Sequence, residues 1–154
     1  MIKGLHHIGV VYKDFSEVAE KTKELYGIPE IRIIDANVEV NTYIKELTKP
    51  LKIKVGFAML GETMIELFQP LDNNSLYSEF LETVPEGGIH HVGILVENID
   101  EELKKWDAMG IKRIISGALP TNRFVYYDTR EMFGYVTELM DNESPPPEML
   151  FQNK

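Results

Sequence analysis

Apolar and polar residues recur along the chain in a pattern that predicts two similar halves. The stretch 4–34 begins with "GLHHIGVV", the stretch 88–115 begins with "GIHHVGIL", and each octet has the short apolar run of a buried strand. Apolar residues then recur at helical spacing in both stretches. A glycine follows each helical segment, Gly27 in one and Gly110 in the other, and glycine commonly ends a helix. Each stretch therefore reads as strand, helix and strand.

The starts of the helices are marked by short polar residues. Asp14 and Asn98 each stand three residues before a glutamate, which is typical of an N-cap, so we expect them to begin the two helices. Residues 72–87 between the halves read as a short helix within a linker, and three residues are candidates for its cap: Asn73, Asn74 and Ser75.

Each half continues with strand-like residues. Residues 55–70 predict a hairpin that turns near Gly61, and residues 123–141 predict a second hairpin. The last strands read "MIELF" and "VTELM", and each has one glutamate at its centre, Glu66 and Glu138. Each half therefore reads β-α-β-β-β, which places the chain in the α+β class.

These elements divide the chain into four segments. Residues 1–71 form the first βαβββ module, 72–87 the linker with its helix, and 88–141 the second module. Residues 142–154 form a tail with a proline run, which cannot join a sheet.

Composition excludes several classes of function. The formal net charge of −9 disfavours a surface for nucleic acid or for an anionic membrane. The chain has no cysteine, so it has neither disulfides nor thiolate metal ligands. The sequence contains neither a recognisable signal peptide nor an apolar run of membrane-spanning length, so we expect a cytoplasmic protein.

All four histidines of the chain lie in the two octets. Side chains alternate between the faces of a strand, so His6 and His7 are expected to point to opposite faces, as are His90 and His91. One histidine of each pair can then face a given cavity. Gly9 shares the face of His7, and the second octet repeats this arrangement, so space is cleared beside each second histidine.

The two mid-strand glutamates point to a metal. Glu66 and Glu138 stand between large apolar neighbours, where a carboxylate is costly to bury without a partner. Histidines and glutamates are repeated at equivalent places in the two halves, and one ion can compensate them together. Two imidazoles and two carboxylates suit a divalent ion such as Co, Ni, Mn, Zn, Fe or Mg, with positions left for water.

The repeat with its "HHIG", "HHVG", "IELFQP" and "TELMD" segments resembles the vicinal oxygen chelate superfamily over residues 4–141. That superfamily includes glyoxalase I, methylmalonyl-CoA epimerase, extradiol dioxygenases and the fosfomycin and bleomycin resistance proteins. The resemblance implies two modules whose mixed sheet curls around a shared metal cavity, usually in a homodimer. The metal ligands that it implies are His7, Glu66, His91 and Glu138.

The stretch 87–112 most resembles the methylmalonyl-CoA epimerase branch. That branch often has glutamine where Glu66 stands, whereas the order His-Glu-His-Glu is more like glyoxalase I. Epimerases also carry a separate catalytic glutamate before the third strand of the first half, and Glu39 and Glu46 are the nearest candidates here.

A metal that chelates a carbonyl compound favours removal of a proton from the neighbouring carbon. Glu66 or Glu138 is the expected base, and an isomerase, epimerase or lyase acting on a small-molecule carbonyl or thioester is the expected function. Alternatives are an Fe(II) dioxygenase that uses His7, His91 and Glu138, and a drug-binding protein of the resistance type. His6 and His90 are expected to support the ligands or to pack. Four residues are expected on or beside a strand of the cavity, where they would either contact the substrate or simply pack: Asn122, Arg123, Tyr126 and Tyr127.

Overall fold

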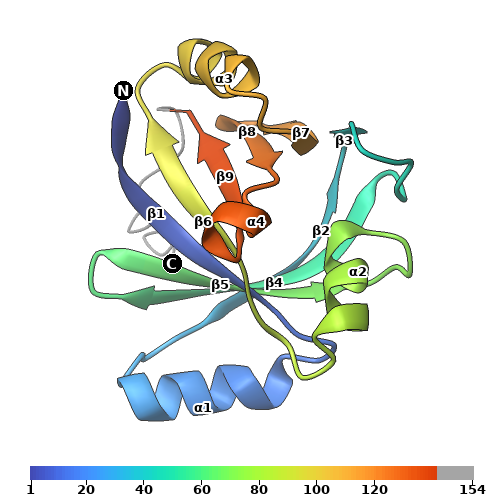
Figure 1. Ribbon diagram of the computed structural model, residues 1–154. Coiled ribbons are helices and arrows are strands. Elements are labelled where there is room, and N and C mark those ends of the chain that lie inside the picture. Colours follow the sequence, from blue (N-terminus) through green and yellow to red (C-terminus); the bar gives the residue numbers. More distant parts are fainter. Residues whose placement is uncertain (142–154) are drawn as a thin grey trace.

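The strands of the protein, which a computed structural model describes over residues 1–141, join into one nine-stranded mixed sheet (Figure 1). The strands are β1 (Ile2–Val11), β2 (Arg32–Val38), β3 (Val40–Thr42), β4 (Leu51–Leu60), β5 (Thr63–Pro70), β6 (Gly88–Val96), β7 (Arg113–Leu119), β8 (Asn122–Tyr127) and β9 (Val136–Met140). The helices are α1 (Ser16–Tyr26), α2 (Leu76–Thr83), α3 (Ile99–Ala108) and α4 (Arg130–Phe133).

The two halves of the sequence repeat form equivalent halves of the sheet. The sheet runs β2-β4-β5-β1-β6-β9-β8-β7-β3. The two His-His strands, β1 and β6, pair antiparallel at its centre, and each pairs in parallel with the glutamate strand of its own half, β5 or β9. The prediction of an α+β fold from two βαβββ modules is therefore confirmed, with the short β3 and α4 as additions.

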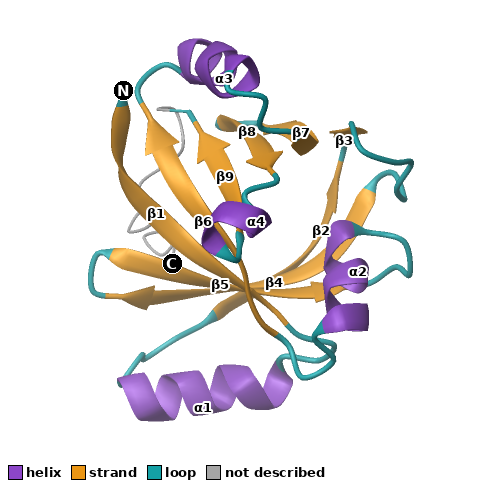
Figure 2. Ribbon diagram, viewed as in Figure 1, coloured by secondary structure: helices purple, strands orange, loops and turns teal. Residues whose placement is uncertain are grey.

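One stretch of chain closes the curl of the sheet. β2 and β3 occupy the two ends of the strand order, yet Glu39 alone separates them in the sequence. β2 pairs with β4 of the first half, and β3 crosses to pair with β7 of the second half. The sheet is therefore nearly barrel-shaped, and Figure 2 shows its strands curving around the centre of the molecule.

The helices α1 and α3 cover the outside of the sheet through small apolar clusters. α1 contributes Ala19 to a cluster with Phe15 and Leu67, and α3 contributes Ile99 to a cluster with Val125. Within residues 1–141, every helix is too short or too polar to cross a membrane.

The predicted cap at Asp14 was wrong. α1 begins at Ser16, and Asp14 instead accepts hydrogen bonds from the backbone nitrogen and the hydroxyl of Ser16. Phe15 takes the N-cap position without a side-chain capping bond, and its side chain is buried in the core. Asn98 caps α3 as predicted, and Ser75 is the residue that caps α2.

Candidate metal centre

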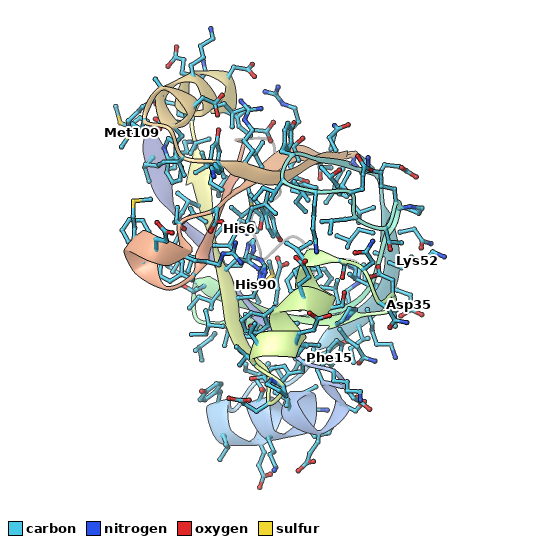
Figure 3. The ribbon with its side chains drawn as sticks, turned by 45° about the vertical axis from the view of Figure 1, so that its right-hand side comes forward. His6, Phe15, Asp35, Lys52, His90 and Met109 are labelled. Carbon is cyan, nitrogen blue, oxygen red and sulfur yellow. The ribbon has the colours of Figure 1, made fainter. Side chains whose placement is uncertain are left out.

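The four histidines form a row across the pairing of β1 with β6. The Nδ1 atoms of His6 and His7 lie 2.9 Å apart, the Nε2 atoms of His7 and His91 lie 3.1 Å apart, and the Nδ1 atoms of His91 and His90 lie 2.9 Å apart. All four side chains are buried, and His6 and His90 lie well inside the molecule (Figure 3). The inner pair, His7 and His91, comes from opposite halves.

Two β-bulges explain how both histidines of a pair reach the interior. Against its partner strand, β1 has one extra residue at His6, and β6 has one extra residue at His90. A bulge interrupts the alternation of side chains. As a result His6 lines the same cavity as His7, and the prediction that only one of them faces a given cavity was wrong.

Gly9 and Gly93 make room for the histidine of the opposite half. A Cβ atom on Gly93 would lie 2.2–2.8 Å from atoms of the His7 ring, and a Cβ atom on Gly9 would lie 2.0–2.5 Å from the His91 ring. The strand register places Gly93 directly across from His7 and Gly9 across from His91. The glycines therefore let the two inner rings approach each other.

We expect Gly93→Ala to displace the His7 ring, to weaken binding of a divalent ion at least tenfold, and to destabilise the fold by about 1–3 kcal/mol through overpacking. Calorimetric metal titration and chemical denaturation measure the two effects. Gly56→Ala is the matched control in β4, because its new Cβ would approach the Ile31 side chain no closer than 3.2 Å. Unchanged metal affinity in Gly93→Ala contradicts the role of this glycine.

Three side chains converge on one point. The Nε2 atoms of His7 and His91 and the Oε2 atom of Glu138 form a triangle with sides of 3.1, 3.1 and 3.5 Å, hereafter the donor triangle. Neighbouring ligands of a six-coordinate ion with bonds of about 2.1 Å lie roughly 3 Å apart. The donor triangle therefore has the size of one face of such a coordination sphere.

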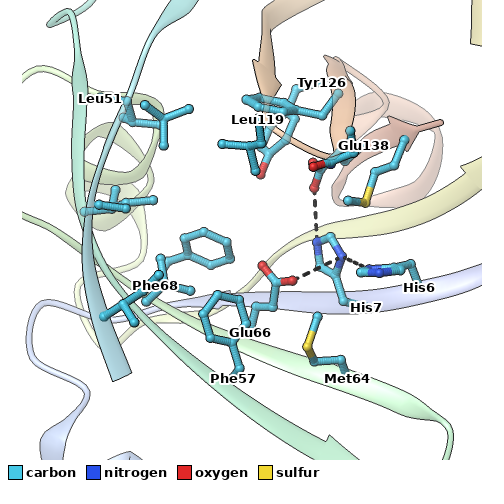
Figure 4. A pocket seen from close by; sticks show the side chains of 18 of the residues that line it. His6, His7, Leu51, Phe57, Met64, Glu66, Phe68, Leu119, Tyr126 and Glu138 are labelled. Carbon is cyan, nitrogen blue, oxygen red and sulfur yellow. Dashed lines mark hydrogen bonds and ion pairs between the residues drawn. The ribbon is translucent and has the colours of Figure 1, made fainter. Parts of the chain in front are cut away.

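Glu66, the fourth predicted ligand, lies beside the donor triangle and does not join it. Its Oε1 atom is 3.6 Å from Nδ1 of His7, on the opposite edge of that ring from Glu138. In Figure 4 the two glutamates approach His7 from two sides. His6, His7 and Glu66 form a second group of possible metal donors within 4.8 Å of one another.

Burial sets the protonation of the site. It raises the pKa of Glu66 to about 7 and the pKa of Glu138 to about 8. It lowers the pKa of His7, against the opposing effect of Glu66, and it places the pKa of His91 well below its usual range. The imidazoles are therefore neutral near pH 7, and each has one ring nitrogen whose lone pair can bind a metal. A divalent cation would displace the carboxyl protons and balance the buried charge, so this donor set fits such an ion.

His6 and His90 each lie in position to orient an inner histidine. When an ion takes the Nε2 lone pair of His7, the proton of that ring is on Nδ1 and points to an acceptor. Nδ1 of His6 is at 2.9 Å, whereas the Glu66 oxygen is farther away at 3.6 Å. His90 has the same relation to His91. This arrangement supports the expectation that the outer histidines hold the ligands in place.

We expect His6→Leu to lower the affinity for a divalent ion about 10- to 100-fold, because His7 loses its orienting acceptor. His6→Asn is the matched control, since its side-chain oxygen can accept at the position of Nδ1, and it should keep most of the affinity. Titration of Co(II) absorption in both variants measures this difference. Equal affinities for the two variants show that His6 only fills space.

Two corners of the donor triangle, His7 and Glu138, line a cavity of about 390 Å³ with mostly apolar walls. Tyr126 and Asn122 line this cavity, as the sequence allowed. Arg123 instead pairs with Asp100 and Asp141, and the Tyr127 hydroxyl donates a hydrogen bond to Asp107. The apolar side chains in the wall are Ile34, Ala36, Val38, Leu51, Ile53, Val55, Phe57, Met64, Phe68, Leu119, Pro120, Phe124 and Met140.

Tyr77 of α2 also lines the cavity, and sequence reasoning did not single it out. Its hydroxyl lies 2.9 Å from that of Tyr126. The apolar spacing of residues 76–81 was the available signal, but it does not tell where the helix docks.

Neither Glu39 nor Glu46 reaches this cavity. Glu39 borders a separate hollow near α3, and Glu46 pairs with Lys49 on the surface. Within residues 1–141, the carboxylates of the cavity wall are therefore Glu66 and Glu138.

A curled sheet of two βαβββ modules with a donor triangle at their seam defines a class of protein. The sequence profile of the Glyoxalase/Bleomycin resistance protein/Dioxygenase superfamily matches residues 6–127, and the chain belongs to this superfamily.

Relatives of the chain include methylmalonyl-CoA epimerases. The human mitochondrial methylmalonyl-CoA epimerase is 25% identical over 88% of this chain and 72% of its own length. An ethylmalonyl-CoA/methylmalonyl-CoA epimerase of Cereibacter sphaeroides is 32% identical over 64% of this chain and 65% of its own. A Streptomyces coelicolor methylmalonyl-CoA epimerase variant in complex with 2-nitronate-propionyl-CoA has the same fold, with a TM-score of 0.69, 15% identity and coverage of 92% and 98% of the two chains.

Proposed function

We propose that the protein is a metal-dependent epimerase or isomerase that moves a proton at the carbon next to a carbonyl group. One observation carries this proposal: the donor triangle opens into an apolar cavity that also holds a second buried carboxyl group, Glu66. The epimerases among the relatives support the same class of reaction.

His7, His91 and Glu138 would hold the ion. When bound, a divalent cation supplies Lewis-acid stabilisation of negative charge on the carbonyl oxygen of the substrate. Two imidazoles and one carboxylate accept Co, Ni, Mn, Zn and Fe, and Mg suits a carboxylate better than imidazole. The three residues come from β1, β6 and β9, so the paired central strands fix their separation.

We assign the base to Glu66. Its carboxyl group is off the donor triangle, so its lone pairs stay available for a proton. Burial raises its pKa to about 7, near the value at which a base works best at neutral pH. In its carboxylate form Glu66 takes the proton from the carbon, and as the acid it gives the proton back.

Glu138 lies on the other side of the His7 ring from Glu66 (Figure 4). As a corner of the donor triangle it would hold the ion as a carboxylate, so we assign the proton transfer to Glu66 alone. The apolar wall excludes water, which otherwise competes for the carbanion.

The substrate class that we propose is a small acyl thioester. The names of the relatives refer to methylmalonyl-CoA and ethylmalonyl-CoA. One structure with the same fold contains 2-nitronate-propionyl-CoA. An apolar cavity beside a metal suits the acyl part of such a molecule.

Hydrogen–deuterium exchange in D₂O tests the proposal. The protein is loaded with Co(II) and incubated with methylmalonyl-CoA, propionyl-CoA or a simple ketone, and mass spectrometry follows the α-carbon. We expect exchange that is lost on treatment with a chelator and restored by the metal. A protein that binds Co(II) but exchanges none of these substrates is not such an enzyme.

A ring-cleaving dioxygenase is the second candidate, and the position of Glu66 favours it. With Glu66 off the donor triangle, His7, His91 and Glu138 alone form the two-histidine, one-carboxylate set typical of Fe(II) oxygenases. Oxygen uptake by the Fe(II)-loaded protein with catechols distinguishes this activity from proton exchange.

A further inference from the structure

Two buried tyrosines form a short hydrogen-bonded chain that ends at the donor triangle. The hydroxyls of Tyr77 and Tyr126 lie 2.9 Å apart, and the Tyr126 hydroxyl lies 3.2 Å from Nε2 of His91. Tyr126 is on β8 directly across from Glu138 of β9, and Tyr77 comes from α2. Both side chains line the cavity, and both are at most 3% exposed.

The His91 nitrogen cannot serve both the tyrosine and a metal ion. A neutral imidazole with its proton on Nδ1 has a single lone pair on Nε2. His91 is in this state when its Nδ1 donates to His90, whose Nδ1 is at 2.9 Å. The Nε2 atom of His91 lies within hydrogen-bond distance of the Tyr126 hydroxyl and, at 3.1 Å, of Nε2 of His7. An ion bound at the donor triangle would take its lone pair, and Tyr126 would then donate to another acceptor.

The cavity offers a place for that new acceptor. Without the His91 lone pair, the Tyr126 hydroxyl can donate to the Tyr77 hydroxyl at 2.9 Å, to the Glu138 carboxylate, or to an oxygen that a substrate brings into the cavity. Its hydroxyl lies beside the His91 corner of the donor triangle and lines the cavity, so an oxygen that approached the ion from the cavity would come near it. Burial raises the pKa of both tyrosines well above their usual range, so both keep their protons.

We propose that Tyr126 is a catalytic residue that donates a hydrogen bond to the substrate carbonyl oxygen as negative charge develops there. Tyr77 is a positioning residue, because its hydroxyl, 2.9 Å away, would donate to the Tyr126 hydroxyl when Tyr126 donates to the substrate. A donor fixed in advance beside a developing oxyanion stabilises it without reorganisation. This inference rests on the proposed function, because it requires a carbonyl substrate in the cavity.

Binding of acetohydroxamate to the Co(II)-loaded protein tests the inference without turnover, because its two neighbouring oxygens resemble those of a chelated enolate. We expect Tyr126→Phe to weaken acetohydroxamate binding at least tenfold, the loss typical of one hydrogen bond to a charged group. Its Co(II) affinity should stay equal or increase, because the competitor for the His91 lone pair is gone. Tyr77→Phe should weaken acetohydroxamate binding two- to fivefold with Co(II) affinity unchanged.

Tyr127→Phe is the matched control, since it makes the same change on the same strand but loses a bond to Asp107. It should bind acetohydroxamate as the unmodified protein does. Unweakened binding in Tyr126→Phe, or a parallel loss of Co(II) affinity, overturns the inference. If Tyr126→Phe does not fold, Tyr77→Phe decides by the same two readouts. If the unmodified Co(II)-loaded protein does not bind acetohydroxamate, the proposed function fails and the inference falls with it.

Discussion

Replacing Glu66 with glutamine is expected to slow α-proton exchange about a thousandfold, within the range that general acid–base catalysis contributes. The amide cannot take a proton from carbon. The protein should still bind its divalent ion, because Glu66 lies beside the donor triangle and not in it. Exchange into D₂O measures the first effect, and metal analysis of the dialysed protein measures the second.

Two variants frame this result. Glu138→Gln should lose both the ion and the exchange, because it removes a corner of the donor triangle. Glu62→Gln, in the exposed turn between β4 and β5, should change neither. General acid–base catalysis contributes at least about a hundredfold. If Glu66→Gln keeps more than about a tenth of the exchange rate, Glu66 is not the base.

The affinity for a divalent ion is expected to rise about tenfold per pH unit from pH 6 to about pH 8 and then to level off. Burial raises the pKa of Glu138 to about 8, so below that value a proton must leave before the carboxylate can bind the ion. His7 and His91 add little to this slope, because burial lowers the pKa of each below its ordinary value.

Competition with a chelator at several pH values gives the slope, and calorimetry in buffers of different ionisation enthalpy counts the protons released. Roughly one proton per ion should be released at pH 7 if Glu138 alone gives up its proton. A larger release means that Glu66 also loses its proton on binding, and Glu66→Gln should remove that excess. An affinity that does not change from pH 6 to pH 8 contradicts the assignment of Glu138 as a ligand.

The sequence was sufficient to predict the fold and to single out the histidines and glutamates that the structure brings together, and their role as metal ligands stays a prediction. Local patterns mark these features: the octets at Gly4 and Gly88, and the mid-strand glutamates. Such patterns can be recognised in the sequence without knowing which strands pair. The space beside the histidines was also foreseen from the glycines. The prediction was that each glycine makes room for the histidine of its own strand. In the structure, Gly9 and Gly93 each make room for the histidine ring of the opposite half.

Other features depend on pairing that no local pattern specifies. The bulges at His6 and His90 arise from the register between β1 and β6, so the alternation rule failed there. Closure of the sheet by residues 32–42 and the docking of Tyr77 are equally non-local. A homodimer and a cytoplasmic location remain predictions, and the proline-containing tail at 142–154 lies outside the described residues.

The centre is built where the two halves meet, and this explains why the chain carries the octet twice. Each half supplies one inner histidine, one outer histidine that orients it, and one glycine that admits the ring of the other half. The glutamates then differ in use, with Glu138 on the donor triangle and Glu66 beside it. A symmetric scaffold thus yields an asymmetric site, in which one carboxylate is free for proton transfer.

The most direct test of the account is anomalous diffraction from crystals of the protein loaded with Co(II) or Zn(II). We predict one strong peak within about 2.0–2.2 Å of Nε2 of His7, Nε2 of His91 and a carboxylate oxygen of Glu138. A peak held by other residues, or an ordered centre in which His7 and His91 do not share an ion, would contradict the account.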